Sequence, residues 1–221
     1  MTYFNNDFVK FFRELEKNNT TDWFHANKTR FENSVKKPFH KFIDDLIDAL
    51  RFVHPNLDMT AKEAIFRINR DIRFSKDKSP YKTHMSALIN EYGKKEYSKP
   101  ALYVQANNKE VRVYSGSHDL DKLQLEKLRR HIVKNITEFN KLINAKPFKS
   151  MFGEILGDKN KKLSPEFQKA AEKQPLLYNK SYYYFYKLPP SVLTGSKLIE
   201  EIVSGYKKAV PINKFLLKGI K

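Results

Sequence analysis

A dense run of charged side chains lies between positions 67 and 82 of this 221-residue chain. It contains six basic residues and two acidic ones, which gives a net charge of +4. The bases are Arg67, Arg70, Arg73, Lys76, Lys78 and Lys82, and the acids are Asp71 and Asp77. An arginine guanidinium offers a planar fork of donors that fits a phosphate or a carboxylate, and a lysine adds a mobile point charge. The run therefore predicts a site for an anion.

Three groups in or beside this run can carry a proton, and Asp71, Asp77 and His84 are therefore the candidate catalytic residues. Each also has a structural interpretation. Among so many bases, the two aspartates are expected to orient the arginines and to reduce the local excess of positive charge. A histidine so placed is more often a hydrogen-bonded residue of a sheet. The spacings match no strong metal-ligand pattern, so neither a metal nor another cofactor is predicted.

Most of the residues predicted to bind the anion come from the same run. They are Arg67, Arg70, Arg73, Lys78, Tyr81, Lys82 and Arg112. Tyr81 has two interpretations, because its ring can stack on a ligand or can anchor the turn after Pro80. The predicted partner is an anionic small molecule, and an enzyme acting on a phosphorylated or other anionic substrate falls within this prediction.

Two other classes of function stay open. The chain has 42 lysines and arginines against 25 acids, a formal net charge of +17, which favours polyanionic partners in general. Tyr103 and Tyr114 lie among basic residues and can stack on unpaired bases, so a nucleic-acid-binding module is the first alternative. The second is a structural or adaptor protein in which the charged run is only a scaffold of ion pairs. The oligomeric state is not predicted.

Composition and missing motifs exclude several kinds of chemistry. The chain has no cysteine, which rules out disulfides, zinc–thiolate sites and thiol nucleophiles. It also lacks the phosphate-binding P-loop, HExxH, GxSxG and GxGxxG motifs. No apolar run approaches the ~20 residues needed to span a bilayer, and no secretion signal opens the sequence. We therefore expect a cytoplasmic protein without membrane insertion.

The charged run must be held by the backbone around it, and an alternating pattern predicts a strand that begins at Ile65. The apolar face of that strand would carry Phe66, Ile68, Ile72 and Phe74, and the polar face Arg67, Asn69, Asp71 and Arg73. Arg70 falls on the apolar face, where an unpaired guanidinium is costly. It should therefore find a carboxylate or lie at a bend. Pro80 ends the run, because proline supplies no amide donor.

The hydrophobic period changes from 3.6 to 2 near Ile65 and back again near Leu120, which predicts a single α+β domain over residues 1–221. A mostly antiparallel sheet would pack against helices from the N- and C-terminal parts of the chain. The predicted elements are a helical segment at 4–53, a sheet meander at 65–116, a helix at 119–144 and a helix–strand–helix block at 164–209.

Further details follow from local patterns. Ser117 or Asp119 is expected to cap the helix at 119–144. Residues 146–162 are expected to form a loop, and a basic tail is expected to follow Tyr206. One solvated face of the sheet would gather Arg67, Arg73, His84, Tyr103, Arg112 and Tyr114.

The stretch from Arg70 to His84 resembles the signature of a conserved-hypothetical family known as domain of unknown function 2461. The likeness includes Asn18-Asn19 before Trp23-Phe24, Leu128-Arg129 through Ile132, and Leu163-Ser164-Pro165 through Tyr186. It therefore covers nearly the whole chain. The resemblance implies membership of the family and brings no activity, substrate or catalytic residue with it.

Overall fold

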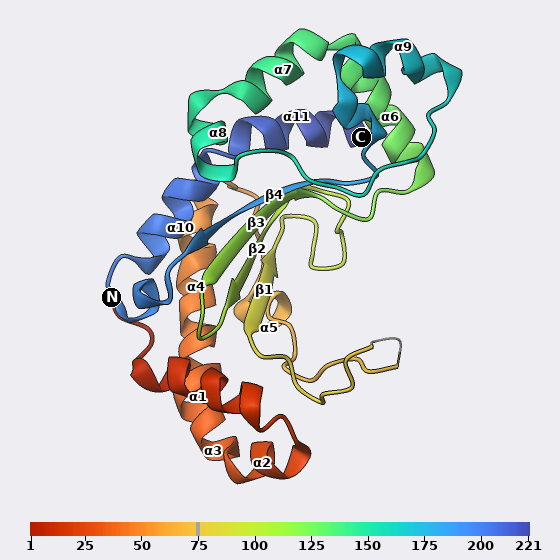
Figure 1. Cartoon of the computed structure of the whole chain (residues 1–221). Helices are drawn as coiled ribbons and strands as arrows, with labels where there is room; N and C mark the ends of the chain where they lie inside the picture. Colours follow the sequence, from red (N-terminus) through yellow and green to blue (C-terminus); the bar gives the residue numbers. More distant parts are fainter. Residues whose placement is uncertain (74–75) are drawn as a thin grey trace. The chain divides into compact units, whose positions relative to one another are not determined.

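The computed structural model describes residues 1–73 and 76–221 (Figure 1). Phe74 and Ser75, which the sequence places at the end of the predicted central strand, lie outside the described residues. The chain groups into two compact units. The first contains Met1–Glu91, Tyr103–Val113 and Lys187–Val203, and the second contains Tyr92–Leu102, Tyr114–Tyr186 and Ser204–Lys221. The single domain predicted from the sequence stays a prediction.

A four-stranded antiparallel sheet and helices from both ends of the chain confirm the predicted α+β fold. Its strands, in the order β1-β2-β3-β4, are β1 (Met85–Ile89), β2 (Ala101–Ala106), β3 (Val111–Ser117) and β4 (Tyr182–Leu188). The turn between β2 and β3 is held by Asn107, whose side-chain oxygen accepts from the amides of Lys109 and Glu110 at 2.8 and 2.9 Å. Strands β2 and β3 therefore form a hairpin within the predicted meander.

The helices of the first unit bury an aromatic core. They are α1 (Asn6–Lys17), α2 (Thr21–Ala26), α3 (Lys28–Phe31), α4 (Lys37–Arg51) and α5 (Ala61–Ala64). Asn5 caps α1, and Phe8, Phe11 and Phe12 on α1 are fully buried. A π-helical turn, Glu32–Lys36, separates α3 from α4. Pro38 follows it in the first turn of α4.

The predicted strand at Ile65 is wrong, because β1 starts only at Met85. Residues 65–70 and 80–84 instead form two extended legs (Figure 1). An isolated antiparallel bridge joins them at Asn69–Tyr81, and another joins Ile65 to Ala87 of β1. The proline at position 80 has no amide to donate, and the end of the legs carries charged groups that stay in water. Ile72, predicted on the apolar face, is 42% exposed for the same reason.

In the second unit the helix predicted at 119–144 is broken in two. It forms α6 (Lys122–Lys134) and α7 (Ile136–Asn144), separated at Asn135. At the end of α6 the carbonyl of His131 accepts from both the backbone amide of Asn135 at 3.0 Å and its side chain at 2.9 Å. The cap of α6 is Asp121, paired with Gln124 in a capping box, and not Ser117 or Asp119. Ser117 is the last residue of β3.

Two segments predicted to be irregular are helical. The first half of the loop predicted at 146–162 is α8 (Lys146–Phe152), where Phe148 and Phe152 pack their rings against Tyr184 at 4.9 and 5.0 Å. The predicted basic tail is α11 (Val210–Ile220), which packs on α6 and buries its apolar face. In both cases an apolar side chain every three or four residues outweighs the surrounding lysines, because its burial removes apolar surface from water.

The remaining elements confirm the predicted C-terminal block. They are α9 (Pro165–Lys173), a 3₁₀ turn (Pro175–Tyr178), β4, a second 3₁₀ turn (Pro190–Thr194) and α10 (Leu198–Lys207). The second unit also contains a buried polar network. Asn213 on α11 accepts from the Tyr184 hydroxyl at 2.5 Å and donates to the Ser115 hydroxyl at 2.9 Å, and Ser115 donates to the carbonyl of Ala101 at 2.8 Å.

This network predicts a stability effect that an exposed asparagine does not have. Asn213→Ala leaves the buried hydroxyl of Tyr184 without its acceptor, so we expect the free energy of unfolding to fall by roughly 2–3 kcal/mol. The matched control is Asn144→Ala on α7, because that side chain is exposed and its bonds to the Asn140 carbonyl and to Lys149 lie in water. Urea denaturation measures both. Equal losses in the two variants would contradict the prediction.

Candidate functional site

The residues predicted to form the site all lie in the first unit, and the structure divides them into three places. The exposed end of the legs holds Asp71, Arg73, Asp77 and Lys78, the legs themselves hold Arg67, Arg70, Tyr81, Lys82 and His84, and β3 holds Arg112. The backbone of the two legs, rather than one face of a strand, therefore positions most of the site.

At the end of the legs the charged groups are bonded to one another. Arg73 and Asp71 form a two-pronged pair, with Nε–Oδ1 at 3.0 Å and Nη2–Oδ2 at 2.7 Å. The guanidinium of Arg73 holds the pKa of Asp71 far below its usual range. Lys78 donates to the backbone carbonyl of Ile72 at 2.8 Å. These groups are exposed, so each pair contributes little to stability.

Arg70 is half-buried and has found the carboxylate that the sequence predicts. Its Nη2 lies 3.0 Å from Oδ2 of Asp77 and also donates to the backbone carbonyl of Tyr81 at 3.4 Å. The other oxygen of Asp77 accepts from the amide of Ser79 at 2.9 Å, and this bond, with the charge of Arg70, lowers the pKa of Asp77. The Nε of Arg70 is buried and has no hydrogen-bond acceptor within the described part of the chain.

Tyr81 joins the legs to the N-terminal helices. The side chain of Asn19, just before α2, donates from Nδ2 to the carbonyl of Tyr81 at 2.9 Å and accepts from its amide at 3.1 Å. The Tyr81 ring is buried and stacks on Phe24, with the ring centroids 3.9 Å apart and the planes 14° apart. Of the two roles predicted for Tyr81, this geometry is that of the anchor.

His84 lies directly before β1, half-buried, with three cations near it. Burial has the largest effect on its pKa, followed by the charges of Lys82, Arg70 and Arg112, and together they lower it from 6.5 to about 4. The imidazole is therefore neutral at physiological pH and offers one N–H donor and one acceptor nitrogen. We call Arg70, Lys82, His84 and Arg112 the His84 cluster. Arg112 also pairs with Glu110, and Lys82 donates to the carbonyl of Arg67 at 3.0 Å.

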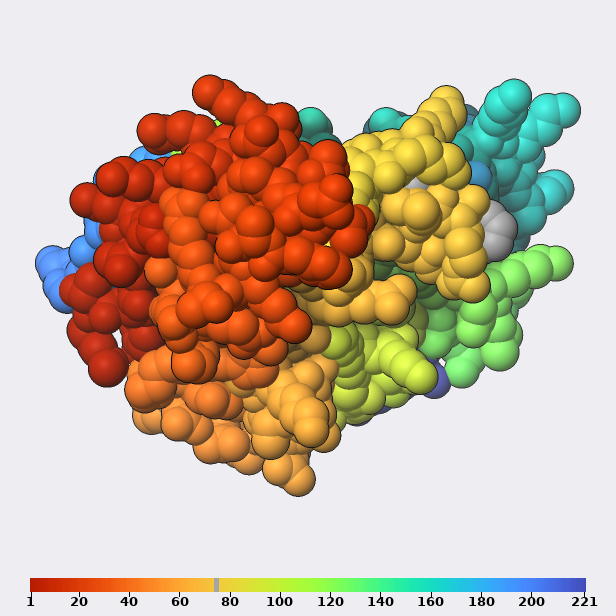
Figure 2. Space-filling view, turned by 90° about the horizontal axis from the view of Figure 1, so that it is seen from below, coloured from red at the N-terminus to blue at the C-terminus, as the bar shows by residue number. Residues whose placement is uncertain are grey.

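Beside these legs the first unit has a cavity of about 570 Å³ that the sequence did not reveal. Of the predicted ligand-binding residues it includes Arg67 alone. Its polar and charged lining residues are Lys28, Glu32, Lys36, His40, Lys62, Arg67 and Asn69. The sequence contains one indication of the cavity, which is the polar, basic face of the helical segment at 4–53. Lys28 and Lys36 both fall on that face. In Figure 2 the surface of this segment (red to orange) adjoins that of the legs (yellow).

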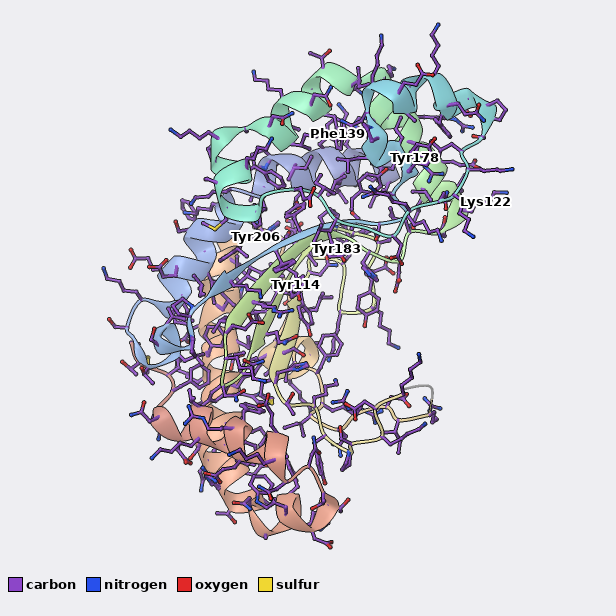
Figure 3. The ribbon with its side chains drawn as sticks, viewed as in Figure 1. Tyr114, Lys122, Phe139, Tyr178, Tyr183 and Tyr206 are labelled. Atoms are coloured by element: carbon purple, nitrogen blue, oxygen red, sulfur yellow. The ribbon has the colours of Figure 1, made fainter. Side chains whose placement is uncertain are left out.

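The predicted gathering of charged and aromatic residues on one solvated sheet face is wrong in its details. Arg67 and Arg73 are on no strand, because the legs replace the predicted one. Tyr103 is half-buried with its ring 6.0 Å from that of Phe66. Tyr114, labelled in Figure 3, belongs to the second unit, where its ring lies 5.0 Å from that of Phe185. The two tyrosines proposed for base stacking thus already pack against other rings.

In the part of the chain that the structure describes, no group of three or more His, Asp or Glu side chains is arranged to hold a metal ion. No helix in the same residues combines the length and the apolar character that crossing a membrane requires.

The structure defines an α+β protein in which two charged legs lie between N-terminal helices and the first strand of an antiparallel sheet. The chain belongs to the family described as "Conserved hypothetical protein (DUF2461)", whose model matches residues 7–215. The match includes the legs, the His84 cluster and the cavity. A comparison with curated proteins finds no significant match.

The clamp between Asn19 and Tyr81 predicts a loss of stability. Asn19→Ala removes both bonds to the Tyr81 backbone, so we expect unfolding free energy to fall by roughly 2–3 kcal/mol. Asn18→Ala is the control, because the neighbouring side chain also donates to a carbonyl, that of Glu14, but is exposed. We expect it to cost about 1 kcal/mol or less. Denaturant unfolding compares them, and a smaller loss in the Asn19 variant would refute the clamp.

His84 predicts a pH dependence of stability. Its pKa is about 4 in the folded protein and about 6.5 in the unfolded chain, so the unfolded chain binds more protons between these values. The contribution of His84 is complete above about pH 6.5 and is lost as the pH falls towards 4. We expect His84→Gln to remove up to roughly 3 kcal/mol of this acid-induced loss.

Urea unfolding of wild type and variant across this pH range measures the effect. The control is His25→Gln, which replaces an exposed histidine on α2 and should leave the acid profile of the wild type unchanged. Parallel profiles for wild type and His84→Gln would contradict the prediction.

Proposed function

We propose that this protein binds a small anion of the phosphate type at the His84 cluster. The observation that carries the proposal is the arrangement of Arg70, Lys82 and Arg112 around a half-buried, neutral histidine. Burial disfavours the protonated form of His84 most, and repulsion from the three like charges adds to this effect. A bound anion would relieve this repulsion and would accept hydrogen bonds from the cations and from the imidazole N–H.

The hydrogen bonds of Arg70 support the same proposal. Its buried Nε lacks an acceptor among the described residues, and an unsatisfied buried donor normally costs roughly 1–3 kcal/mol. Its carboxylate partner Asp77 is 55% exposed, so this ion pair is weak enough for an anion to compete with it. A phosphate oxygen can therefore compete for the guanidinium without displacing a strong internal partner.

The other predicted residues receive lesser roles in this proposal. Arg73 and Lys78, at the exposed end of the legs, would attract the anion through long-range electrostatics. Asp71 and Asp77 would orient Arg73 and Arg70, because Asp71 accepts hydrogen bonds from Arg73 and Asp77 forms an ion pair with Arg70. Tyr81 would anchor the legs. The proposal extends to an enzyme if the anion is part of a phosphorylated substrate. His84 would then be the candidate proton carrier beside the bound anion.

Nucleic-acid binding ranks below a small anion. Its motivation was a pair of tyrosines free to stack on bases, but Tyr103 and Tyr114 are half-buried against other rings. The lack of cysteine accords with the cytoplasmic location that we propose for the protein.

A titration with inorganic phosphate tests the proposal. We expect the anion to raise the melting temperature and to raise the pKa of His84, because its negative charge stabilises the imidazolium form. Arg70→Gln, Lys82→Gln and Arg112→Gln should each weaken binding by about tenfold, the equivalent of 1.4 kcal/mol. NMR of the His84 ring protons and calorimetry give the two readouts.

The control is Lys169→Gln, which removes one positive charge from an exposed position on α9 in the second unit. It should leave the affinity for phosphate unchanged. If neither phosphate nor sugar phosphates and nucleotides stabilise the wild type, while Arg70→Gln unfolds it, the charged run is a scaffold and the proposal is wrong.

A further inference from the structure

The cavity of the first unit has an apolar interior and a cationic edge. Its apolar lining residues are Phe24, Phe31, Ile65, Phe66, Ile68 and Met85. Its volume of about 570 Å³ lies within the roughly 300–1,000 Å³ range of small-molecule sites. A cavity of this size with an apolar lining accommodates an organic group far better than it does a bare, strongly hydrated ion.

The charges at its edge do not cancel. Four cations line the cavity against the single carboxylate of Glu32, which is paired with Lys36 at 2.8 Å. Lys28, Lys62 and Arg67 form no salt bridge with any described residue. The charge of Arg67 acts on Asp71 at longer range, where it helps to lower the pKa of that carboxyl group. The cavity therefore retains three positive charges, which favours a ligand with more than one negative charge.

A second feature of the backbone points to the same cavity. Glu32–Lys36 is a π-helical turn, and both of its end residues line the cavity. π-helical turns are rare and occur frequently at functional sites. Glu32 and Lys36 lie four residues apart and pair within this turn, so the carboxylate does not neutralise the other cations.

We propose that this cavity binds an organic phosphate, with its apolar body among the phenylalanines and its phosphate at Lys28, Lys62 and Arg67. A phosphate monoester carries a charge near −2 at neutral pH, which matches three uncompensated cations better than the single charge of a carboxylate does. The cavity shares no side chain with the His84 cluster, so this site is separate from the one proposed above. The protein would then have two anion sites in the first unit.

Calorimetry with 1-naphthyl phosphate tests this inference, with 1-naphthol and inorganic phosphate as partial ligands. We expect 1-naphthyl phosphate to bind the wild type at least about tenfold more tightly than either of them, because only it engages both the apolar interior and the cations. Lys62→Gln and Arg67→Gln should each weaken its binding by about fivefold. Both side chains are exposed, so neither change is expected to disturb the fold.

Two control variants separate this site from others. Lys17→Gln removes an exposed charge from the end of α1, outside the cavity, and should leave the affinity for 1-naphthyl phosphate unchanged. Arg112→Gln should weaken inorganic phosphate binding but not that of 1-naphthyl phosphate. If the naphthyl ligand instead depends on Arg112 and not on Lys62 or Arg67, it occupies the His84 cluster and the inference is overturned.

The nature of the anion is tested with 1-naphthoate. We expect weaker binding than for 1-naphthyl phosphate, because the carboxylate has one charge fewer. Equal affinities would overturn the assignment of a phosphate. Equal affinities for 1-naphthol and 1-naphthyl phosphate would overturn the inference as a whole, since the cations would then contribute nothing.

Discussion

The paired hydrogen bonds between the Asn19 side chain and the backbone of Tyr81 hold the charged legs to the N-terminal helices. One amide side chain does here what a neighbouring strand does in a sheet, because it offers a donor and an acceptor to the same residue. The stacked rings of Phe24 and Tyr81 complete the contact. The carbonyl of Tyr81 also accepts from Arg70, so the same residue positions the guanidinium of the His84 cluster. Phe24 also lines the cavity, so the same contact connects the His84 cluster with the cavity wall.

Two carboxylates of the first unit join helices. Arg30 on α3 pairs with Asp7 and Glu14 on α1 at 2.7 and 2.6 Å, and the two carboxylates raise its pKa while their own are lowered. Asp45 on α4 accepts from the hydroxyl of Tyr3 at 2.7 Å. These acids hold the N-terminal segment together, whereas Asp71 and Asp77 pair within the charged run.

The second unit explains other parts of the likeness to the family. Arg129 is buried and donates to the carbonyls of Leu177 and Asn179 at 2.8 and 3.2 Å, and its guanidinium lies 6.0 Å from the ring of Phe167. These bonds satisfy backbone acceptors directly before β4. Two parts of the likeness to the family, the residues around Arg129 and the segment ending at Tyr186, therefore contact each other. Together they form a structural scaffold. In the first unit two other parts of the likeness contact each other, because Asn19 forms hydrogen bonds with Tyr81 of the central run.

Local patterns in the sequence determined the α+β class, most helices and strands, and the need of Arg70 for a carboxylate, since periodicity, capping and the cost of a buried charge act over a few residues. Only the tertiary structure decided the break at Asn135, the helix at 210–220, the replacement of a strand by two legs, and the cavity. These depend on contacts between distant segments: Asn19 meets Tyr81 across 62 residues, and the cavity needs α3, α5 and β1 together. No local pattern records which distant side chains share a space, because that depends on packing.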